Sequence, residues 1–332
     1  MDSGPRSAQT PGERLVMLGR QRPRRQAVAR GTSRRHLDTR ARLCFARIVA
    51  VATRWSIATN GVAMKSLRAL LVAVLSLAAL AVMGLPAFAI TNPRPDNEEH
   101  PYVGLAVFDV DGVPSHRCTG TLLSPTVFLT AGHCTDGTSA ARVWFAEEVQ
   151  ENAEYPFSGA TSYDGVPYTI PGFCIGCGSG LPGFAQRDAG IIVLSEPVPT
   201  SVVSSYGLLP EPGLVDRLPS TAPVDLVGYG VQTNQRGGGR PVWTGLRNRF
   251  QADARLVSGN FRHSSEFVRV TADPGQGKGG TCFGDSGGPI LTDEGRTILA
   301  VNSYVTNNNC AGVTYSQRVD IPEILAWIES FL

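Results

Sequence analysis

The chain has 332 residues, a formal net charge of +2 and seven cysteines, and its length suits one large domain or two. The charge is unevenly distributed. Residues 1–63 carry 13 Arg, no Lys and 3 acidic residues, whereas residues 90–332 carry 15 basic and 25 acidic residues. Because the basic residues of this acidic body are scattered and outnumbered, we expect no nucleic-acid partner.

A leader precedes the acidic body. Residues 64–68 form a short basic start, residues 69–83 are apolar except for one Ser, and residues 87–89 (AFA) are a small-x-small cleavage site. This pattern predicts a secretory signal peptide over residues 64–89, and hence a secreted protein. A transmembrane anchor is the alternative, but an apolar run of about 15 residues is shorter than the roughly 20 that span a bilayer. We therefore expect no membrane contact after signal cleavage.

Residues 1–63 lie upstream of an intact signal, are rich in Arg and show no hydrophobic period. One interpretation is a disordered basic extension. The favoured interpretation is that Met64 is the true start and that residues 1–63 are upstream sequence read as protein. The working body is then residues 90–332. The bias toward Arg over Lys favours a GC-rich genome and hence a bacterial source.

Six cysteines remain once the leader, with its Cys44, is removed. An even number of cysteines behind a signal peptide predicts disulfides in an oxidising compartment. Cys174 and Cys177 form the sequence CIGC, which is also compatible with a redox motif or half of a zinc site. No second CxxC and no nearby His completes a zinc set, so a local disulfide in a surface loop is favoured.

Short apolar runs alternate with turns rich in Gly, Pro, Asn and Asp, which predicts many short strands. The runs cover residues 102–108, 126–131, 190–194, 224–231, 267–271 and 298–305. Helical periodicity is confined to the C-terminus, where five apolar residues share one face: Ile321, Ile324, Leu325, Ile328 and Leu332. The pattern predicts an all-β barrel or sandwich followed by one helix.

The motif GDSGGP at residues 284–289 places Ser286 in a G-x-S-x-G context. That context also describes the nucleophile of α/β-hydrolases, but those enzymes place their His after the Ser, and every His of this chain precedes Ser286. A serine nucleophile needs a base and an orienting carboxylate. LTAGHC offers His133, and RDAGIIVL offers Asp188 at the mouth of an apolar strand. The order is His, Asp, Ser, with gaps of 55 and 98 residues.

These motifs resemble those of the chymotrypsin/trypsin family of serine proteases. TAGHC, DAGIIVL and GDSGGP occur in the order of the family and at roughly its spacing, and the resemblance covers residues 90–332. GYG at residues 228–230 resembles the Gly-aromatic-Gly that opens the second barrel of the family. The resemblance implies two six-stranded antiparallel β-barrels, over about residues 90–205 and 206–332, with a terminal helix and with the triad between the barrels.

The resemblance also implies a secreted serine endopeptidase that acts on protein or peptide substrates through an acyl-enzyme. Ser286 would attack the scissile carbonyl, His133 would transfer the proton, and Asp188 would orient His133. The backbone N–H groups of Gly284 and Ser286 would form the oxyanion hole. The reaction implied needs no cofactor and no metal, and we expect a monomer.

The same resemblance implies that Cys118 pairs with Cys134 and that Cys282 pairs with Cys310. It offers no counterpart for Cys174 and Cys177, which lie in a long insertion before Asp188.

The resemblance places Gly280 at the base of the primary pocket, followed by Thr281. Because Gly280 offers no charge, we expect no preference for Lys or Arg at the residue before the scissile bond (P1). Ser303 should lie beside the triad, Val305 should narrow the entrance, and Gly312 should form the facing wall. We therefore expect a small or medium apolar side chain in the pocket, with a wider chymotrypsin-like pocket as the alternative.

Ile90 directly follows the expected cleavage site. In the family, a free apolar N-terminus folds inward, and its ammonium pairs with the carboxylate before the nucleophile, here Asp285. Signal cleavage after Ala89 would release that N-terminus without a propeptide. Pro93 departs from the Gly-Gly usual near this point and limits the backbone there. The alternative is an ordinary cleavage site at which Ile90 is incidental.

The sequence leaves two other interpretations open. A catalytically inactive protease fold used for binding is the alternative function, disfavoured because no triad residue is replaced. Glu147, Glu148 and Glu154 lie roughly where some family members bind calcium, but a solvated acidic loop is favoured.

Overall fold

The structure is a computed structural model, and it describes residues 90, 93–181, 184–234, 242–257, 259, 264–272, 279–292, 295–306, 310 and 312–332. All of them belong to one compact unit, residues 85–332. The predicted signal peptide over residues 64–89 and the segment of residues 1–63 lie outside the described residues. In the described part, no helix is both long and apolar enough to cross a membrane.

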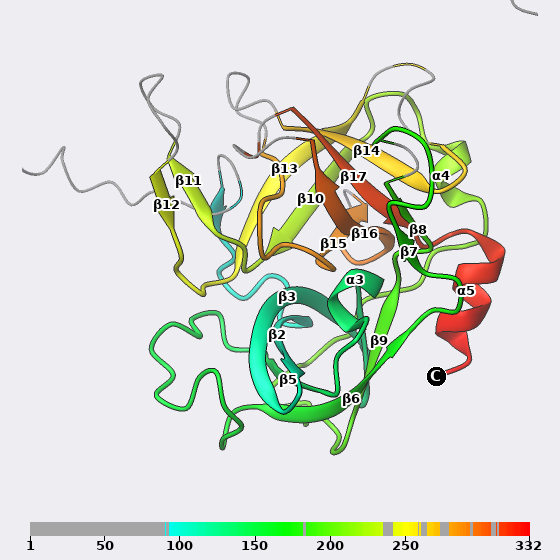
Figure 1. The fold of residues 1–332 in the computed structure, drawn as a ribbon. Coiled ribbons are helices and arrows are strands. Elements are labelled where there is room, and N and C mark those ends of the chain that lie inside the picture. Colours follow the sequence, from blue (N-terminus) through cyan, green and yellow to red (C-terminus); the bar gives the residue numbers. More distant parts are fainter. Residues whose placement is uncertain are drawn as a thin grey trace, which may run out of the picture. The chain divides into compact units, whose positions relative to one another are not determined.

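The first half of the body is a closed antiparallel barrel (Figure 1). Six strands follow one another around it in the order β2, β3, β4, β9, β6, β5. They are β2 (Val103–Val110), β3 (Val113–Ser124), β4 (Val127–Thr130), β5 (Ala140–Trp144), β6 (Tyr163–Thr169) and β9 (Gly190–Leu194). The apolar runs at residues 102–108, 126–131 and 190–194 correspond to β2, β4 and β9.

The second half forms a sheet in the order β1-β13-β10-β15-β16-β17-β14, and a further pairing of β13 with β14 closes six of these strands into a barrel. The strands are β1 (Arg94–Pro95), β10 (Pro223–Gly228), β13 (Phe250–Leu256), β14 (Phe267–Ala272), β15 (Pro289–Thr292), β16 (Ile298–Val305) and β17 (Gly312–Arg318). The expected architecture of two six-stranded antiparallel barrels is therefore confirmed.

The remaining elements are short. Two small hairpins pair β7 with β8 and β11 with β12, and three helices are described. Their bounds are β7 (Cys174–Ile175), β8 (Ala185–Gln186), β11 (Gln232–Asn234), β12 (Val242–Thr244), α3 (Gly132–Thr135), α4 (Leu214–Arg217) and α5 (Pro322–Glu329). Of these, α3 and the β7–β8 hairpin border the candidate site described below.

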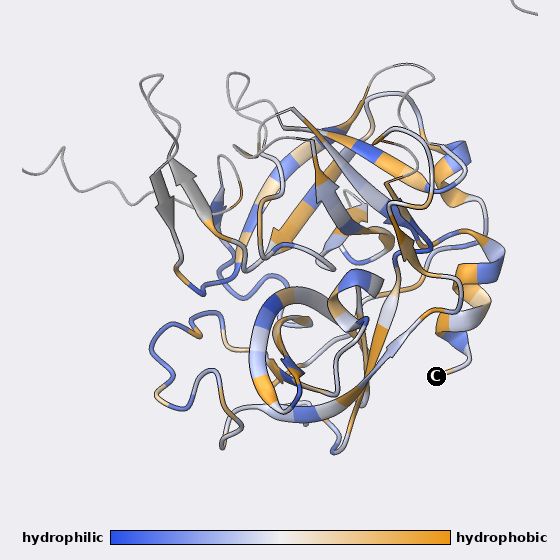
Figure 2. Cartoon of the chain, viewed as in Figure 1, coloured by the Kyte–Doolittle hydropathy of each residue, from blue (hydrophilic) through white to orange (hydrophobic). Residues whose placement is uncertain are grey.

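Apolar side chains fill the interior of each barrel. Figure 2 shows hydrophobic residues along β9 and β10 and hydrophilic residues in much of the long loop between β5 and β6. Strand β13 alternates buried and exposed residues over most of its length, as expected for a strand with one face on a core. Gly120 of β3 lies where a Cβ would overlap the ring of Phe128 on β4, so only Gly allows these two strands to approach so closely.

The C-terminal helix α5 is the expected one. Pro322 occupies its first turn, where the missing N–H costs no hydrogen bond. Its buried face belongs to the same apolar cluster as the first barrel, and the ring of Phe331 beyond the helix lies 5.3 Å from that of Tyr168 on β6. The chain therefore leaves the second barrel at β17 and ends against the first.

A buried ion pair ties the start of the body to both barrels. Asp96, which follows β1, accepts hydrogen bonds from Arg249 Nε at 2.7 Å and lies 2.6 Å from His100 Nδ1. Arg249 directly precedes β13 and also donates to the carbonyl of Phe145, which follows β5 of the first barrel, at 2.8 Å. Burial acts to raise the pKa of Asp96, but His100 and Arg249 outweigh it and hold this pKa below its ordinary value.

Candidate active site

His133 lies on the short helix α3, which follows β4 of the first barrel. Its backbone N–H and its ring Nδ1 both contact Asp188, at 2.8 and 2.9 Å from the two carboxylate oxygens. Asp188 precedes β9 and is fully buried. With Nδ1 facing Asp188, the Nε2 atom of His133 is left to act on a substrate or on Ser286.

Asp188 is held from both barrels. Besides His133, the hydroxyl of Ser303 on β16 donates to its carboxylate, and its backbone N–H donates to Gln317 Oε1 on β17 at 2.8 Å. Burial acts to raise the pKa of Asp188, but the charge and hydrogen bonds of His133 and the Ser303 hydroxyl hold it below its ordinary value. Burial acts to lower the pKa of His133, and the charge of Asp188 overcomes this and raises it.

Ser286 lies on a turn between the two barrels. Its carbonyl accepts a hydrogen bond from Thr119 N on β3 at 2.8 Å, and the next residue, Gly287, donates to Asn302 O on β16 at 2.7 Å. Gly287 has φ 77°, and a Cβ there would overlap the hydroxyl of Thr130. The turn therefore requires Gly after the serine, for its backbone angle and for its lack of a side chain.

Two backbone donors next to Ser286 are free. Gly284 has φ 97°, and its carbonyl accepts a hydrogen bond from Thr119 Oγ1 at 2.8 Å, which sets the orientation of the loop. Among the described residues, no group accepts a hydrogen bond from the N–H of Gly284 or of Ser286. These two N–H groups are therefore available to a developing oxyanion.

His133 and Ser286 line one cavity of about 310 Å³. The other lining residues are Phe184, Thr281, Cys282, Phe283, Asn302, Ser303, Tyr304 and Val305. Of the hydrogen bonds among described residues, none joins Ser286 Oγ to His133 Nε2. In a free enzyme this bond is often long and shortens when substrate binds.

Three of the five expected pocket residues line the cavity: Thr281, Ser303 and Val305. The Thr281 hydroxyl bonds the hydroxyl of Thr314 on β17 at 3.1 Å. Gly280 is buried directly before Thr281, and Gly312 lies exposed at the start of β17 with φ 105°, but neither is among the described residues that line the cavity. The described residues that form the walls are therefore all larger than glycine.

Three aromatic residues at the cavity escaped the sequence analysis. Phe184 and Phe283 are each nearly half exposed, and the ring of Phe184 packs edge-on against Tyr304 with centroids 5.0 Å apart. Tyr304 stacks on Tyr315 of β17 at 4.9 Å. Tyr304 lies between Ser303 and Val305, two of the expected pocket residues, whereas Phe184 lies in the insertion before Asp188, where no motif pointed to the cavity.

Asp285 is fully buried and accepts hydrogen bonds from the backbone N–H groups of Gly230 and Cys282, both at 2.8 Å. Burial raises its pKa to about 6, although these bonds and the charge of Arg117 act against the increase.

Ile90 is buried in the apolar cluster of the second barrel. In the full chain Ile90 is joined to Ala89, so its nitrogen carries no charge, and no described contact joins it to Asp285. The activation pair of Ile90 and Asp285 stays a prediction.

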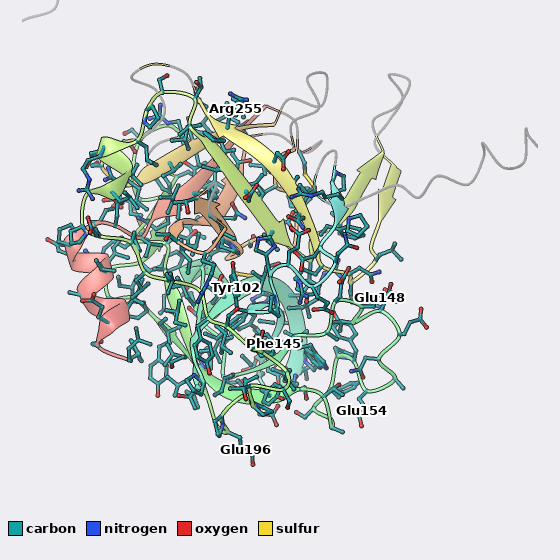
Figure 3. The ribbon with its side chains drawn as sticks, turned by 180° about the vertical axis from the view of Figure 1, so that it is seen from behind. Tyr102, Phe145, Glu148, Glu154, Glu196 and Arg255 are labelled. Atoms are coloured by element: carbon teal, nitrogen blue, oxygen red, sulfur yellow. A yellow bond between two sulfur atoms is a disulfide. The ribbon has the colours of Figure 1, made fainter. Side chains whose placement is uncertain are left out.

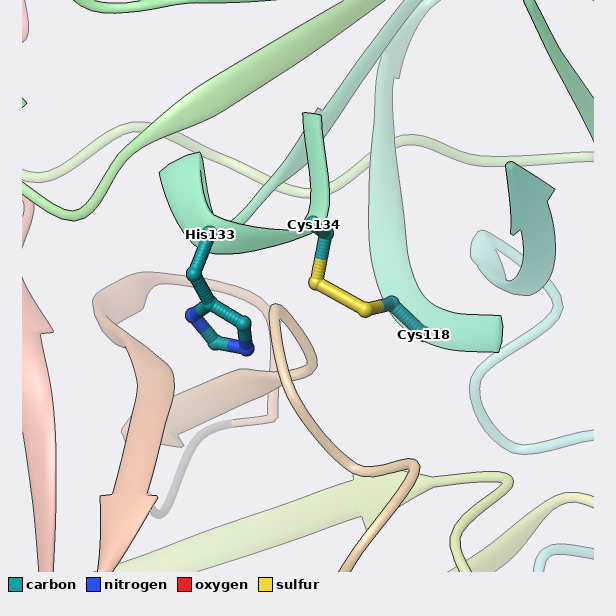
Figure 4. A group of neighbouring side chains, drawn as sticks. All are labelled: Cys118, His133 and Cys134. Atoms are coloured by element: carbon teal, nitrogen blue, oxygen red, sulfur yellow. A yellow bond between two sulfur atoms is a disulfide. The ribbon is translucent and has the colours of Figure 1, made fainter. Parts of the chain in front are cut away.

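The structure has three disulfides among its described residues. They are Cys118–Cys134, Cys174–Cys177 and Cys282–Cys310. Figure 4 shows the first of them beside His133, linking α3 to β3. Cys118, His133 and Cys134 are close enough to resemble a metal site, but the two sulfurs are bonded to each other and neither is a free thiolate ligand.

Two of the three acidic residues suggested for calcium bind backbone N–H groups. Glu147 accepts hydrogen bonds from the backbone N–H groups of Asn97 and Glu98, and Glu154 accepts one from the N–H of Ala160. Figure 3 shows Glu148 and Glu154 at the outer edge of the body. These contacts describe a loop whose carboxylates bind backbone donors.

The fold and this arrangement of Ser, His and Asp define a protein of the chymotrypsin-fold class. The Trypsin family model matches residues 91–328, so the chain belongs to the trypsin family of serine proteases. Scolexin B of Heliothis virescens is 28% identical over 252 residues, which cover 71% of this chain and 80% of scolexin B. Chymotrypsin-like elastase family member 3B of Homo sapiens is 27% identical over 218 residues, 61% of this chain and 73% of the relative. Because these relatives are animal proteins, the bacterial source stays a prediction.

Solved structures share the fold. An HL collagenase matches with a TM-score of 0.53 and 17% identity, covering 75% of this chain and 98% of that chain. A variant of human heparin binding protein matches with a TM-score of 0.50 and 16% identity, covering 73% and 94%. At such identities the likeness extends to the fold alone.

Proposed function

We propose that the protein is a secreted serine endopeptidase that cleaves protein or peptide substrates through an acyl-enzyme. The observation that supports this best is the contact between His133 and a fully buried Asp188, together with the cavity that His133 and Ser286 both line. The backbone N–H groups of Gly284 and of Ser286 itself are both free. No other group of the described residues competes for these donors.

In the first step, Ser286 Oγ attacks the scissile carbonyl while His133 Nε2 takes the hydroxyl proton. Asp188 holds the His133 ring through Nδ1 and stabilises the imidazolium that forms. The carbonyl oxygen becomes an oxyanion, which the N–H groups of Gly284 and Ser286 bind. Loss of one such donor costs about 10²–10³ in rate in other serine proteases.

In the second step, the C–N bond breaks and His133 gives its proton to the leaving amine. An ester then joins the acyl half of the substrate to Ser286 Oγ. Water attacks this ester with His133 again as base, and the acid product leaves with Ser286 restored. Every proton transferred in the cycle passes through Nε2 of His133.

The cavity favours an apolar P1 side chain. No Asp or Glu is among the described residues that line it, so a Lys or Arg of the substrate would find no counter-ion there. Thr281 turns its hydroxyl toward Thr314, and Val305 and Phe283 supply apolar surface. We therefore propose small or medium apolar side chains as the preferred P1 residues.

We also propose that signal cleavage before Ile90 activates the protein. A free ammonium at Ile90 would supply Asp285 with a positive charge inside the second barrel. Ile90 already belongs to the same apolar cluster as Leu226 and Phe250. Leu226 lies two residues before Gly228 on β10, and Phe250 of β13 pairs with Gly228. Asp285 packs against this same Gly228. The precursor in the producing cell would lack the ammonium and remain inactive.

The experiment that tests the proposal is intact mass spectrometry of the exported protein, with and without a fluorophosphonate probe. We expect a mass that begins at Ile90 and gains one probe adduct. Ser286→Ala should lose the adduct and reduce hydrolysis of a small ester by roughly 10⁴–10⁶-fold. His133→Ala should also lose labelling, because the probe needs an activated serine.

A mass that begins at Ile90 with no adduct would instead support the alternative, a catalytically inactive fold used for binding. One structural neighbour is a variant of a heparin binding protein. The body of this chain carries 25 acidic against 15 basic residues, so it lacks the net positive charge that attracts a polyanion. A longer mass that labels only after trimming would refute activation by signal cleavage alone.

A further inference from the structure

Arg117 is a half-buried cation beside the turn that carries Ser286. It lies on β3 two residues before Thr119, and residues two apart on a strand point to the same face. Thr119 Oγ1 donates to Gly284 O, so Arg117 faces the same turn. Its Nε lies 3.5 Å from the position that a Cβ on Gly284 would occupy. With no side chain on Gly284, the guanidinium lies directly against the turn.

The guanidinium of Arg117 lacks a bonded partner. Among the described residues, no hydrogen bond or ion pair joins its side chain to another group. The comparable inward-facing arginines, Arg142, Arg249 and Arg318, each form an ion pair with a carboxylate. Asp285 is near enough for Arg117 to act on its charge, but the hydrogen bonds of Asp285 come from backbone N–H groups. Five N–H donors therefore remain available for an anionic ligand.

Arg117 borders one particular side of the candidate site. On one side of His133, Asp188 bonds Ser303 of β16, and the cavity lies there. On the other side, the residue after His133 is joined by a disulfide to Cys118, the neighbour of Arg117 on β3 (Figure 4). Arg117 is not among the residues that line the cavity. If the acyl half of a peptide occupies the cavity, the leaving half extends from Ser286 out of it, and Arg117 lies beside the turn of Ser286 and outside the cavity.

We propose that Arg117 binds a carboxylate in the leaving half of the substrate, so that the enzyme prefers Asp or Glu in the first residues after the scissile bond. This inference rests on the proposed function. A guanidinium matches a carboxylate with two parallel N–H···O bonds, a geometry that Lys does not reproduce. The preference is local, because the body as a whole is acidic and repels anions.

The test uses internally quenched peptides that are identical up to the scissile bond and carry Glu, Gln or Lys at the second residue after it. We expect kcat/KM for the Glu peptide to exceed that for the Gln peptide by about tenfold, the value of a charge-assisted hydrogen bond. Arg117→Gln should abolish this ratio, and Arg117→Lys should restore part of it. Arg217→Gln, which removes the same charge from α4, should keep the full ratio.

Two results would overturn the inference: equal rates for the Glu and Gln peptides, or an Arg117→Gln variant that slows a small ester as much as it slows the Glu peptide. The second result would mean that Arg117 acts through Asp285 and the turn. Binding of the same peptides to Ser286→Ala, measured as Kd, separates the two proposals. A preference for Glu in Kd without any hydrolysis by the natural protein would support the Arg117 site and reject the peptidase.

Discussion

At the level of single residues, Asp188 receives contacts from parts of the chain that lie far apart. Its partners are His133 from α3, Ser303 from β16 and Gln317 from β17. The sequence indicated Asp188 through its motif and placed Ser303 beside it. Gln317 could not be predicted, because it lies 129 residues away and stands in no motif. Such a carboxylate is rigid because both barrels hold it.

Asp188→Asn should therefore affect both rate and pH dependence. The variant removes the charge that raises the pKa of His133, so burial is left to lower it. Since His133 must be neutral to act as a base, the acidic limb of kcat/KM should move to lower pH. The maximum rate should fall by about 10⁴-fold, because the amide favours the wrong tautomer of His133. An acidic limb that stays in place would contradict the role of Asp188. Far-UV circular dichroism would check that the variant is folded.

At the level of elements, the β7–β8 hairpin is an insertion that reaches the cavity. Cys177 is exposed, whereas the cysteines of the other two disulfides are buried. Gly176 N donates to Phe184 O at 2.6 Å, and the hydroxyl of Tyr304 donates to Leu181 O. The disulfide thus links β7 to the start of the loop that follows it, beside Gly176, and the same loop leads to Phe184, which packs against Tyr304.

Replacing Cys174 and Cys177 together by Ser should weaken this wall. We expect KM to rise about two- to tenfold for peptides with an apolar residue upstream of P1, since an aromatic pair contributes about 0.5–1.5 kcal/mol. Phe184→Ala should give a similar rise in KM. Steady-state kinetics on two peptides, one with Leu and one with Gly at the residue upstream of P1, would measure the change in KM. A double Ser variant with the KM of the natural protein would show that the hairpin holds Phe184 without its disulfide.

The barrels and the terminal helix could be predicted from the sequence better than the walls of the cavity. Both barrels and α5 were predictable, because strands and turns alternate regularly and the motifs have a characteristic order. The walls of the cavity were predicted less well, since Gly280 and Gly312 do not line it and Phe184 and Phe283 do. Pocket shape depends on loops whose course is set by contacts distant in sequence. Arg117 was missed for the same reason, because only the fold brings it to Gly284.

At the level of the whole molecule, the described body depends on ties between its barrels. The pair of Asp96 and Arg249 is fully buried and also bonds the carbonyl of Phe145. A buried pair contributes little net stability, but loss of one partner leaves an uncompensated charge. The exposed pair of Arg94 and Asp253, at 2.9 Å, offers a matched comparison nearby.

Asp96→Asn should lower the free energy of unfolding by about 3–5 kcal/mol at neutral pH. Asp253→Asn should change it by less than about 1 kcal/mol, because water screens an exposed pair. The folded pKa of Asp96 is lowered, so its contribution is present above the unfolded value of about 3.9 and is lost as the pH falls through the folded pKa. Urea unfolding at neutral and acidic pH would measure both. Equal effects of the two variants at neutral pH would refute the role of the buried pair.

The residues proposed to bind the two halves of the substrate come from different barrels. Thr281, Ser303 and Val305, which we propose contact the acyl half of the substrate, belong to the second barrel, whereas Arg117, which we propose binds the leaving half, belongs to the first. Substitutions at distant sites without shared partners have additive effects on free energy. The residue accepted before the cut and the residue accepted after it can therefore be altered one at a time. Evolution or an engineer could retarget such an enzyme in two separate steps, each leaving the other half of its recognition intact.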